Sequence, residues 1–358
     1  MAELIFGWTT ASSLWVFFVI FAGINFFASV YMVKYLSAIK KRTKMSAAVA
    51  GAAILSVISS LPEIVSAITA GLIGSPEVSI GNIMGANLFS GVMLVIVDLI
   101  FIRYLFFTKI NRSNRIMIYI MIVINMILVV TFLPIKAFDF MRITIPYLNI
   151  SWVFLLLLVF YVIFLFFVFK GFGDVDAEPR TKKDIGLKKM SLKLIISLFL
   201  IFAIVLVISS ILLVTVIDNF ERVYFIKKDS AGAIFLGMTT ALPEVISLFI
   251  LCRIGFGNVA IAGIFGSHFF NSIIYLITDA FDYRIGAIER IQGNDVNNLL
   301  SLFILAIFLT GTMMVFGLKT WKKISTSKVG TYVTSSVIII FYVASVIIPI
   351  LYHNQLLV

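Results

Sequence analysis

Charged residues and cysteine are both scarce in this sequence. Asp, Glu, Lys and Arg make up 13% of the 358 residues, about half the share found in a typical soluble domain. So few charges could not cover, in water, a chain that is 61% hydrophobic and contains 35 Phe. The single cysteine, Cys252, excludes an intrachain disulfide and a cysteine-based metal cluster. We therefore expect a protein that lies in lipid. We also expect no cofactor.

Long apolar runs follow one another along the whole chain. A helix needs about 20 largely apolar residues to cross a bilayer, and an open sheet edge cannot satisfy its backbone polar groups in hydrocarbon. The sequence therefore predicts an all-α integral membrane protein with ten transmembrane helices. They are expected near residues 12–36, 46–72, 77–102, 114–134, 149–170, 193–217, 230–252, 257–281, 297–318 and 330–352.

The basic residues predict the orientation of these helices. Residues 1–10 contain no Lys or Arg, so the first run is read as a retained helix with its N-terminus outside. In that orientation the cytoplasmic loops hold 21 of the 28 Lys and Arg residues and the outer loops hold 7. This asymmetry explains the net charge of +11 without a nucleic-acid partner. We expect both termini outside, a cytoplasmic central loop and a plasma-type membrane, with the oligomeric state undetermined.

The chain repeats itself. A shift of 181 positions aligns Leu61-Pro62-Glu63 with Leu242-Pro243-Glu244, and 13 of the 40 positions from Ser59 to Asp98 are identical after that shift. Because each half contains an odd number of predicted spans, the two repeats should have opposite orientations. Inverted repeats of this kind hold the substrate site of many secondary transporters near the bilayer midplane. The predicted organisation is a five-helix repeat at 1–170, a linker at 171–192 and an inverted five-helix repeat at 193–358. The stretches that match after the shift lie at about 46–102 in the first repeat and at about 230–281 in the second.

The two glutamates are the main chemical signal. Glu63 and Glu244 lie within predicted spans, where an ionised group costs several kcal/mol unless it is paired or hydrated. Each follows a proline, which removes a backbone hydrogen bond, so we expect a helix break with carbonyls freed at about Ser56–Ser59 and Gly237–Thr240. One alternative is a plain kink with an internal salt bridge. The occurrence of the motif in both repeats favours a shared site.

Such a site would be built from oxygen atoms. Ser59, Ser60 and Thr240 stand next to the expected breaks, and Ca²⁺ accepts six to eight oxygen ligands. Two neighbouring carboxylates repel each other unless a cation or a proton lies between them. That requirement would couple the binding of one ion to the release of another.

A glycine-rich segment forms the second part of each repeat. Residues 81–90 (GNIMGANLFS) align with residues 262–271 (AGIFGSHFFN). Small residues allow close helix packing, which is the favoured interpretation of Gly85 and Gly266. Ser90, Ser267 and Asn271 add oxygen atoms on the helix face expected to look toward the glutamates. Asp98 and Asp279, also paired by the shift, are expected to serve the architecture rather than an ion.

These repeats resemble the α-repeats of the cation/Ca²⁺ exchanger superfamily, whose sodium/calcium exchangers carry G-T-S-x-P-E/D followed by G-N-x-x-G-S-N-x-x-N/D. The resemblance covers nearly the whole chain. It implies a central divalent site formed by Glu63, Glu244 and the carbonyls near Ser59 and Thr240. It further implies flanking monovalent sites that draw on Ser60, Ser90, Thr240, Ser267, Asn271 and the carbonyl of Gly237.

The sequence departs from the family pattern around the flanking sites. Ala241 and Ala86 replace motif serines, Ser90 stands where Asn or Asp is expected, and His268 replaces an Asn. The divalent centre therefore fits the pattern better than a three-sodium stoichiometry does. His268 could serve a proton-coupled exchanger, although a neutral hydrogen-bonding role in helix packing is the favoured interpretation.

The leading hypothesis is a secondary antiporter that exchanges Ca²⁺, or a related divalent cation, for Na⁺ by alternating access. A proton-coupled divalent exchanger is the first alternative. A non-transporting membrane scaffold or receptor is the alternative from another class. No nucleotide-binding G-x-x-x-x-G-K-[ST] motif, no H-E-x-x-H motif, no paired aspartates and no serine–histidine dyad support an enzyme.

Overall fold

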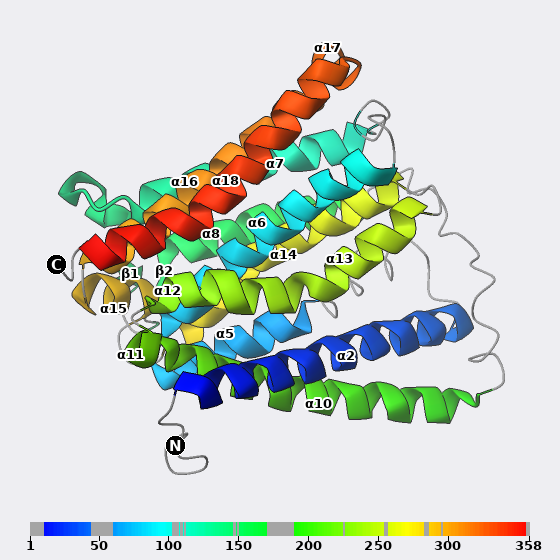
Figure 1. Cartoon of the computed structure of the whole chain (residues 1–358), viewed down its shortest axis with the longest axis horizontal. Coiled ribbons are helices and arrows are strands. Elements are labelled where there is room, and N and C mark those ends of the chain that lie inside the picture. Colours follow the sequence, from blue (N-terminus) through cyan, green and yellow to red (C-terminus); the bar gives the residue numbers. More distant parts are fainter. Residues whose placement is uncertain are drawn as a thin grey trace.

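The computed structural model shows an almost wholly helical chain (Figure 1). It describes residues 11–43, 60–101, 107, 110, 112–145, 148, 150–169, 190–224, 226–253, 257–282, 286–294 and 296–355. The predicted linker at 171–192 lies almost entirely outside the described residues. The same holds for most of the predicted span 46–72.

Helices make up nearly every element. The longer ones are α2 (Ala11–Thr43), α5 (Leu61–Ile73), α6 (Pro76–Phe101), α7 (Arg112–Phe132), α8 (Trp152–Phe169), α10 (Leu192–Asp218), α13 (Gly237–Arg253), α14 (Gly257–Phe281), α16 (Val296–Lys319) and α18 (Lys328–Gln355). Shorter elements are η3 (Lys136–Arg142), α11 (Phe220–Tyr224), α12 (Lys228–Ala231), the π-helical turn η4 (Gly232–Leu236), α15 (Ala287–Asn294) and α17 (Lys322–Ser325). Two-residue strands β1 (Thr144–Ile145) and β2 (Ile150–Ser151) pair antiparallel.

The prediction of an all-α membrane protein is confirmed. Eight helical stretches among the described residues are long and apolar enough to cross a membrane, and α5 and α8 are shorter apolar helices. Each predicted span overlaps one of these ten segments. The count of ten transmembrane helices in two inverted repeats stays a prediction, because α5 is only 13 residues long and residues 44–59, which precede it, are not described.

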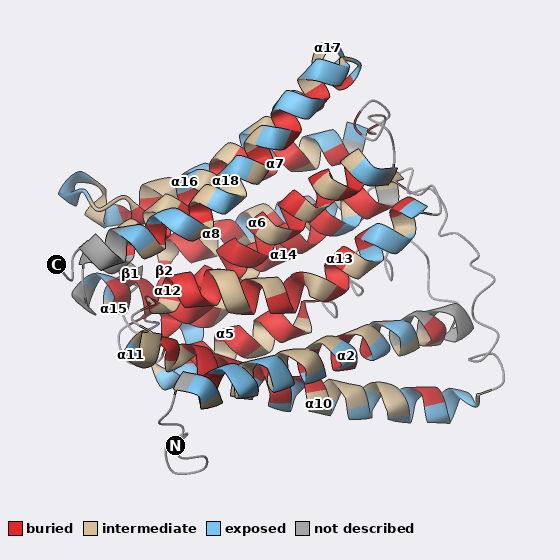
Figure 2. Cartoon of the chain, in the orientation of Figure 1, coloured by how far each residue is buried: buried red, intermediate tan, exposed pale blue. Residues whose placement is uncertain are grey.

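Four helices occupy the middle of the bundle. In Figure 1, α5, α6, α13 and α14 lie between the pair α2–α10 on one side and the group α7, α16 and α18 on the other. α5 packs on α14 and α13 packs on α6, and α6 and α14 also contact each other. Figure 2 shows that α6 and α14 are mostly buried, whereas α2, α10 and α18 have exposed faces. The central position of the motif-bearing helices follows from their small residues, which allow contact on several sides.

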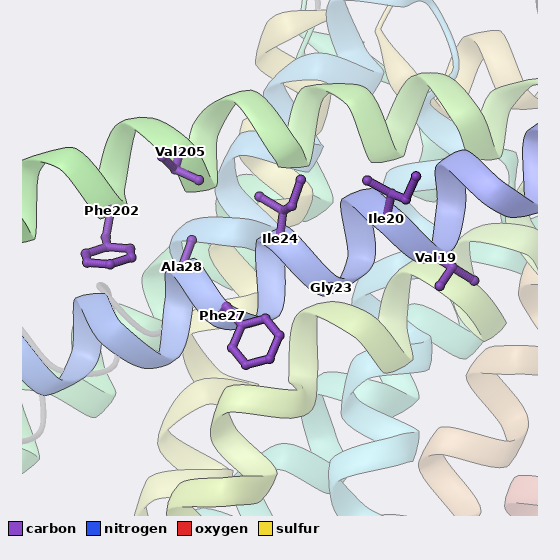
Figure 3. Close-up of a pocket in the computed structure, with 8 residues that line it drawn as sticks. All are labelled: Val19, Ile20, Gly23, Ile24, Phe27, Ala28, Phe202 and Val205. Carbon is purple, nitrogen blue, oxygen red and sulfur yellow. The ribbon is translucent and has the colours of Figure 1, made fainter.

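Helices α2 and α10 form a pair at the lipid-facing edge. They pack against each other, and Asn25 joins them by donating from Nδ2 to the hydroxyl of Ser210 at 2.7 Å. Val19 and Ile204 are more than half exposed, at 64% and 60%, as expected of side chains that contact acyl chains. A groove of about 450 Å³ between the two helices is lined only by apolar residues, among them Phe27 and Phe202 (Figure 3). Its lining excludes it as an ion pathway.

The two Pro-Glu motifs differ in backbone structure. Pro62 lies in the first turn of α5, where its missing N–H has no intrahelical partner to lose. Pro243 lies inside α13, and the helix continues through it. The expected break in the second half is therefore wrong. A distortion lies about two to three turns before Pro243, where the N–H of Gly237 bonds to the carbonyl of Gly232 in the π-helical turn η4.

Asp98 and Asp279 serve the architecture, as predicted, but with different partners. Asp98 forms a fully buried ion pair with Lys319, whose Nζ lies 3.2 Å from Oδ2 and donates to Ser335 at 2.7 Å. Asp279 instead accepts the backbone N–H groups of Ser151 and of Ala287, the first residue of α15. The repeat thus conserves a carboxylate position while each half uses it differently.

Candidate cation site

The carboxylates of Glu63 and Glu244 lie close enough to interact electrostatically. Both side chains are buried, with 1% and 8% of their surface exposed. Glu63 lies in the first turn of α5, where the helix dipole and free N–H groups stabilise a negative charge. Glu244 lies inside α13 and has no such help from its own helix. The sequence motif is the same in both halves. The helix dipole acts differently on the two glutamates because α5 begins next to Glu63, whereas α13 begins seven residues before Glu244.

Hydroxyl groups from both repeats face the two carboxylates. Ser60 stands directly before α5 and makes no capping hydrogen bond through its side chain. Its hydroxyl faces Glu244, as does that of Ser267. The hydroxyl of Thr240 faces Glu63 and donates to Asn82 Oδ1 at 3.1 Å. Each glutamate therefore contacts a hydroxyl from the opposite repeat, which makes the site a shared one.

Several oxygen atoms of this cluster have no hydrogen-bond partner among the described residues. They are Glu63 Oε2, Glu244 Oε1, Ser60 Oγ and, further along α14, Asn271 Oδ1. A buried oxygen without a donor costs free energy comparable to a lost hydrogen bond. A hard cation offers such oxygens the compensation that the protein does not.

Ser90 and Asn271 each contact a polar side chain of the opposite repeat. The Ser90 hydroxyl lies 2.8 Å from His268 Nε2, and Asn271 Nδ2 donates to Asn87 Oδ1 at 2.7 Å. All four side chains are at least 97% buried. The structure thus gives His268 the hydrogen bond between helices that was expected of it.

Gly237 lies where α13 meets α6 at short range. A Cβ at this position would come within 2.7 Å of the Ala86 backbone nitrogen. Gly81 and Gly85 on α6 similarly leave no room for a Cβ beside the backbones of Asp229 and Ala233. The packing role expected of Gly85 is confirmed. These glycines bring the α6 backbone against the turn that precedes Thr240.

The predicted ligands fall into three groups. Glu63, Glu244, Ser60, Thr240 and Ser267 form the cluster just described, and Ser90, Asn271 and Gly237 lie on the helices around it. Ser56 and Ser59 lie outside the described residues.

Sequence reasoning missed three buried polar residues near the site. Asn82 accepts from Thr240, Asn87 accepts from Asn271, and Ser66 has a buried hydroxyl without a partner among the described residues. Asn82 and Asn87 belong to the glycine-rich segment, and Ser66 is identical to its counterpart Ser247 after the shift. Polar side chains in an apolar run were therefore the available signal.

The chemistry of the cluster is that of a hard-cation site. Among the described residues, no three His, Cys, Asp or Glu side chains gather as metal ligands would. Within the part of the chain that the structure describes, the acidic groups of the cluster are therefore Glu63 and Glu244, and its other oxygen atoms belong to hydroxyl and amide groups. Transition metals prefer imidazole or thiolate, whereas Ca²⁺ and Na⁺ accept neutral oxygens of this kind.

Together, these features define a multi-pass, all-helical membrane protein with a buried pair of carboxylates between two sequence-related helix pairs. Residues 12–170 and 194–351 match the model of a family described as sodium/calcium exchanger protein. The match covers most of the chain, so the protein belongs to that family. Its members are ion exchangers, which are transporters and not enzymes.

Solved structures share the fold. The chain superposes on the H⁺/Ca²⁺ exchanger CAX with a TM-score of 0.58 and 14% identity, over 99% of this chain and 94% of that one. It superposes on the sodium-calcium exchanger NCX_Mj with a TM-score of 0.54 and 16% identity, over 92% of this chain and 97% of that one. No curated protein sequence matches significantly. At these identities the structural likeness establishes the fold alone.

Proposed function

We propose that the protein exchanges Ca²⁺, or a related divalent cation, for Na⁺ by alternating access, with Glu63 and Glu244 as its central ligands. The observation that carries the proposal is the pair of buried carboxylates, each with an oxygen that lacks a partner among the described residues. Hydroxyls from both repeats face the pair. Membership of the exchanger family supplies the reaction class.

The coupling follows from charge balance. Two carboxylates at low dielectric repel each other strongly, so an empty and fully ionised site is disfavoured. One divalent cation, or several monovalent cations, restores the balance in each of the two access states. The empty carrier therefore crosses between states reluctantly, and exchange is favoured over uniport.

Proton coupling is the second candidate. Ala86 and Ala241 replace motif serines expected among the sodium ligands, and one structural neighbour is described as an H⁺/Ca²⁺ exchanger. Protons need no extra oxygen ligands, because they neutralise the glutamates directly. Ca²⁺ uptake into proteoliposomes after a Na⁺ jump at constant pH, compared with a pH jump without Na⁺, separates the two couplings.

The central test removes both charges. Glu63→Gln combined with Glu244→Gln keeps the shape of the side chains and takes away both ionisable ligands. We expect Ca²⁺ flux to fall to the level of empty liposomes and calorimetric Ca²⁺ binding to disappear. Glu289→Gln, a change at an exposed position on α15, is the matched control and should transport as the wild type does. Normal flux in the double variant would remove the two glutamates from the transport site, whereas absence of Ca²⁺ flux in the wild type would favour the scaffold or receptor hypothesis.

A further inference from the structure

Two hydrogen bonds between α6 and α14 occupy equivalent positions of the two repeats. One joins Ser90 to His268 at 2.8 Å, and the other joins Asn271 to Asn87 at 2.7 Å. The shift of 181 residues relates Asn87 to His268 and Ser90 to Asn271. The same cross-repeat contact is therefore made twice, with different side chains each time.

On one side, the contact orients an amide. Asn271 donates through its nitrogen to Asn87, and its Oδ1 has no partner among the described residues. Because the amide group is planar, fixing the nitrogen also fixes the direction of the oxygen. An oriented amide oxygen is a ligand that Na⁺ and Ca²⁺ accept.

On the other side, the contact orients a hydroxyl. Ser90 has one proton and two lone pairs to share, and its oxygen lies 2.8 Å from His268 Nε2 and 3.3 Å from the carbonyl of Asn87. When the shorter contact takes the proton, both lone pairs remain available to a cation. The imidazole ring is 1% exposed and packs edge-on against Phe265, so its orientation is fixed.

We propose that Asn87 and His268 are positioning residues that orient the ligands Asn271 and Ser90, which make the two flanking cation sites chemically different. One flanking site then offers an amide oxygen and the other a hydroxyl. This inference rests on the proposed function and adds a specificity determinant to it. Partners that orient a ligand without touching the ion are known to tune cation affinity.

The proposal assigns His268 to the monovalent ion rather than to the divalent centre. Among the described residues, His268 forms no ligand group with the two glutamates. Its contact is Ser90, which belongs to the flanking set. Changing His268 should therefore alter how exchange depends on the driving ion, while Ca²⁺ binding to the central site persists.

The test uses His268→Ala, His268→Gln and the double variant Ser90→Asn with His268→Asn, which rebuilds the amide pair of the other side. A matched control is Ser79→Ala, which removes the 2.6 Å contact between Ser79 and Thr278, another buried contact between α6 and α14. Each protein is reconstituted in liposomes. The measured quantities are the half-saturating concentration of the ion that drives wild-type exchange, the calorimetric Ca²⁺ Kd and the melting temperature.

We expect His268→Ala to raise the half-saturating concentration of the driving ion at least fivefold and to leave the Ca²⁺ Kd within twofold of wild type. His268→Gln, which restores a polar partner for Ser90, should stay within twofold in both quantities. The double variant replaces the hydroxyl ligand with an amide, so it should shift the half-saturating concentration of the driving ion and leave the Ca²⁺ Kd within twofold. Ser79→Ala should change only the melting temperature.

A His268→Ala protein that behaves like Ser79→Ala would overturn the inference, because the contact would then serve packing alone. Equal losses in both ion affinities would overturn it as well. If His268→Ala does not fold, a shifted driving-ion dependence in His268→Gln, or an unchanged one in the double variant, would contradict the inference. Absence of Ca²⁺ flux in the wild type would refute the proposed exchange itself, which is a different outcome from intact flux with an unchanged driving-ion dependence.

Discussion

At the scale of single residues, the candidate site is built from side chains that the fold leaves incompletely paired. Ser60 stands at a helix start, where a serine usually caps the backbone, yet its hydroxyl makes no capping bond and faces Glu244. Thr240 likewise bridges Asn82 and Glu63. Polar groups that could have stabilised local structure are thus directed at the carboxylates.

Removing the Thr240 hydroxyl should weaken cation binding without unfolding the protein. Thr240→Val keeps the shape but deletes the group that faces Glu63 and donates to Asn82. We expect the Ca²⁺ Kd to rise about tenfold, which corresponds to about 1.4 kcal/mol, in a calorimetric titration.

Thr310→Val is the control for this change. Thr310 is also a buried threonine, but its hydroxyl bonds to the carbonyl of Ala306 within α16. It should lower the melting temperature slightly and leave the Ca²⁺ Kd unchanged. A similar loss of Ca²⁺ affinity in both variants would show that Thr240 has no specific role in cation binding.

At the scale of helices, close backbone contact between α6 and the segment before α13 sets the position of the cluster. Gly81, Gly85, Gly232 and Gly237 all lie where an added Cβ would meet the backbone of the facing helix. These contacts place Asn82 against Thr240. A change in the packing of these glycines should therefore displace the site residue Thr240.

Gly85→Ala should disturb this interface. The added methyl group would collide with the Ala233 backbone, which cannot move aside like a flexible side chain, and overpacking of this kind costs about 1–3 kcal/mol. We expect a lower melting temperature and reduced Ca²⁺ flux. Gly23→Ala, where nothing lies within 4 Å of the added atom, should leave both unchanged. Equal stability of the two variants would argue against the close contact.

The Asp98–Lys319 pair joins α6 to α16 and α18 at the end of the bundle away from α15. Both side chains are 1% exposed, and Lys319 Nζ also lies over the Phe107 ring at 5.0 Å. Lys319→Met should lower the free energy of unfolding by about 3 kcal/mol, because it leaves a buried carboxylate without its ammonium. Adding Asp98→Asn to that variant should recover a large part of the loss. Thermal unfolding in detergent measures both, and additive losses would contradict a direct pair.

At the scale of the whole molecule, the central helices are enclosed while the α2–α10 pair borders the lipid. Figure 2 shows this contrast between α6 and α14 inside and α2 and α10 at the edge. The start of α2 and the end of α18 lie at the same end of the bundle as α15 (Figure 1). An even number of crossings is needed for that arrangement.

The predicted orientation can be tested with thiol labelling, because Cys252 is the only cysteine and is buried. In a Cys252→Ser background, a cysteine introduced at Lys182 in the predicted cytoplasmic loop should react only after the membrane is permeabilised. A cysteine introduced at Glu289 on α15 should react in intact cells, because that end of the bundle is predicted to lie outside. The opposite pattern would invert the assigned topology.

The sequence alone determined the class of protein, because an apolar run of about 20 residues has few options other than a helix in lipid. It also identified Glu63 and Glu244 as the candidate ion ligands, since buried charge in such runs is costly. The same motif occurs in both halves, which a chance occurrence would not explain. The packing of Gly85 followed from its small size.

Only the tertiary structure decided which groups meet. The sequence predicted the same helix break at both prolines, but Pro62 begins a helix while α13 runs through Pro243, and the irregular turn of the second half, η4, precedes α13. The partners of Asp98 and Asp279 could not be read from equivalent positions, since Lys319 lies on α16 whereas Ser151 lies on β2 and Ala287 on α15. The sequence predicted that Glu63 and Glu244 share one site. Their proximity depends on packing between helices that are distant in the chain, which the sequence does not show.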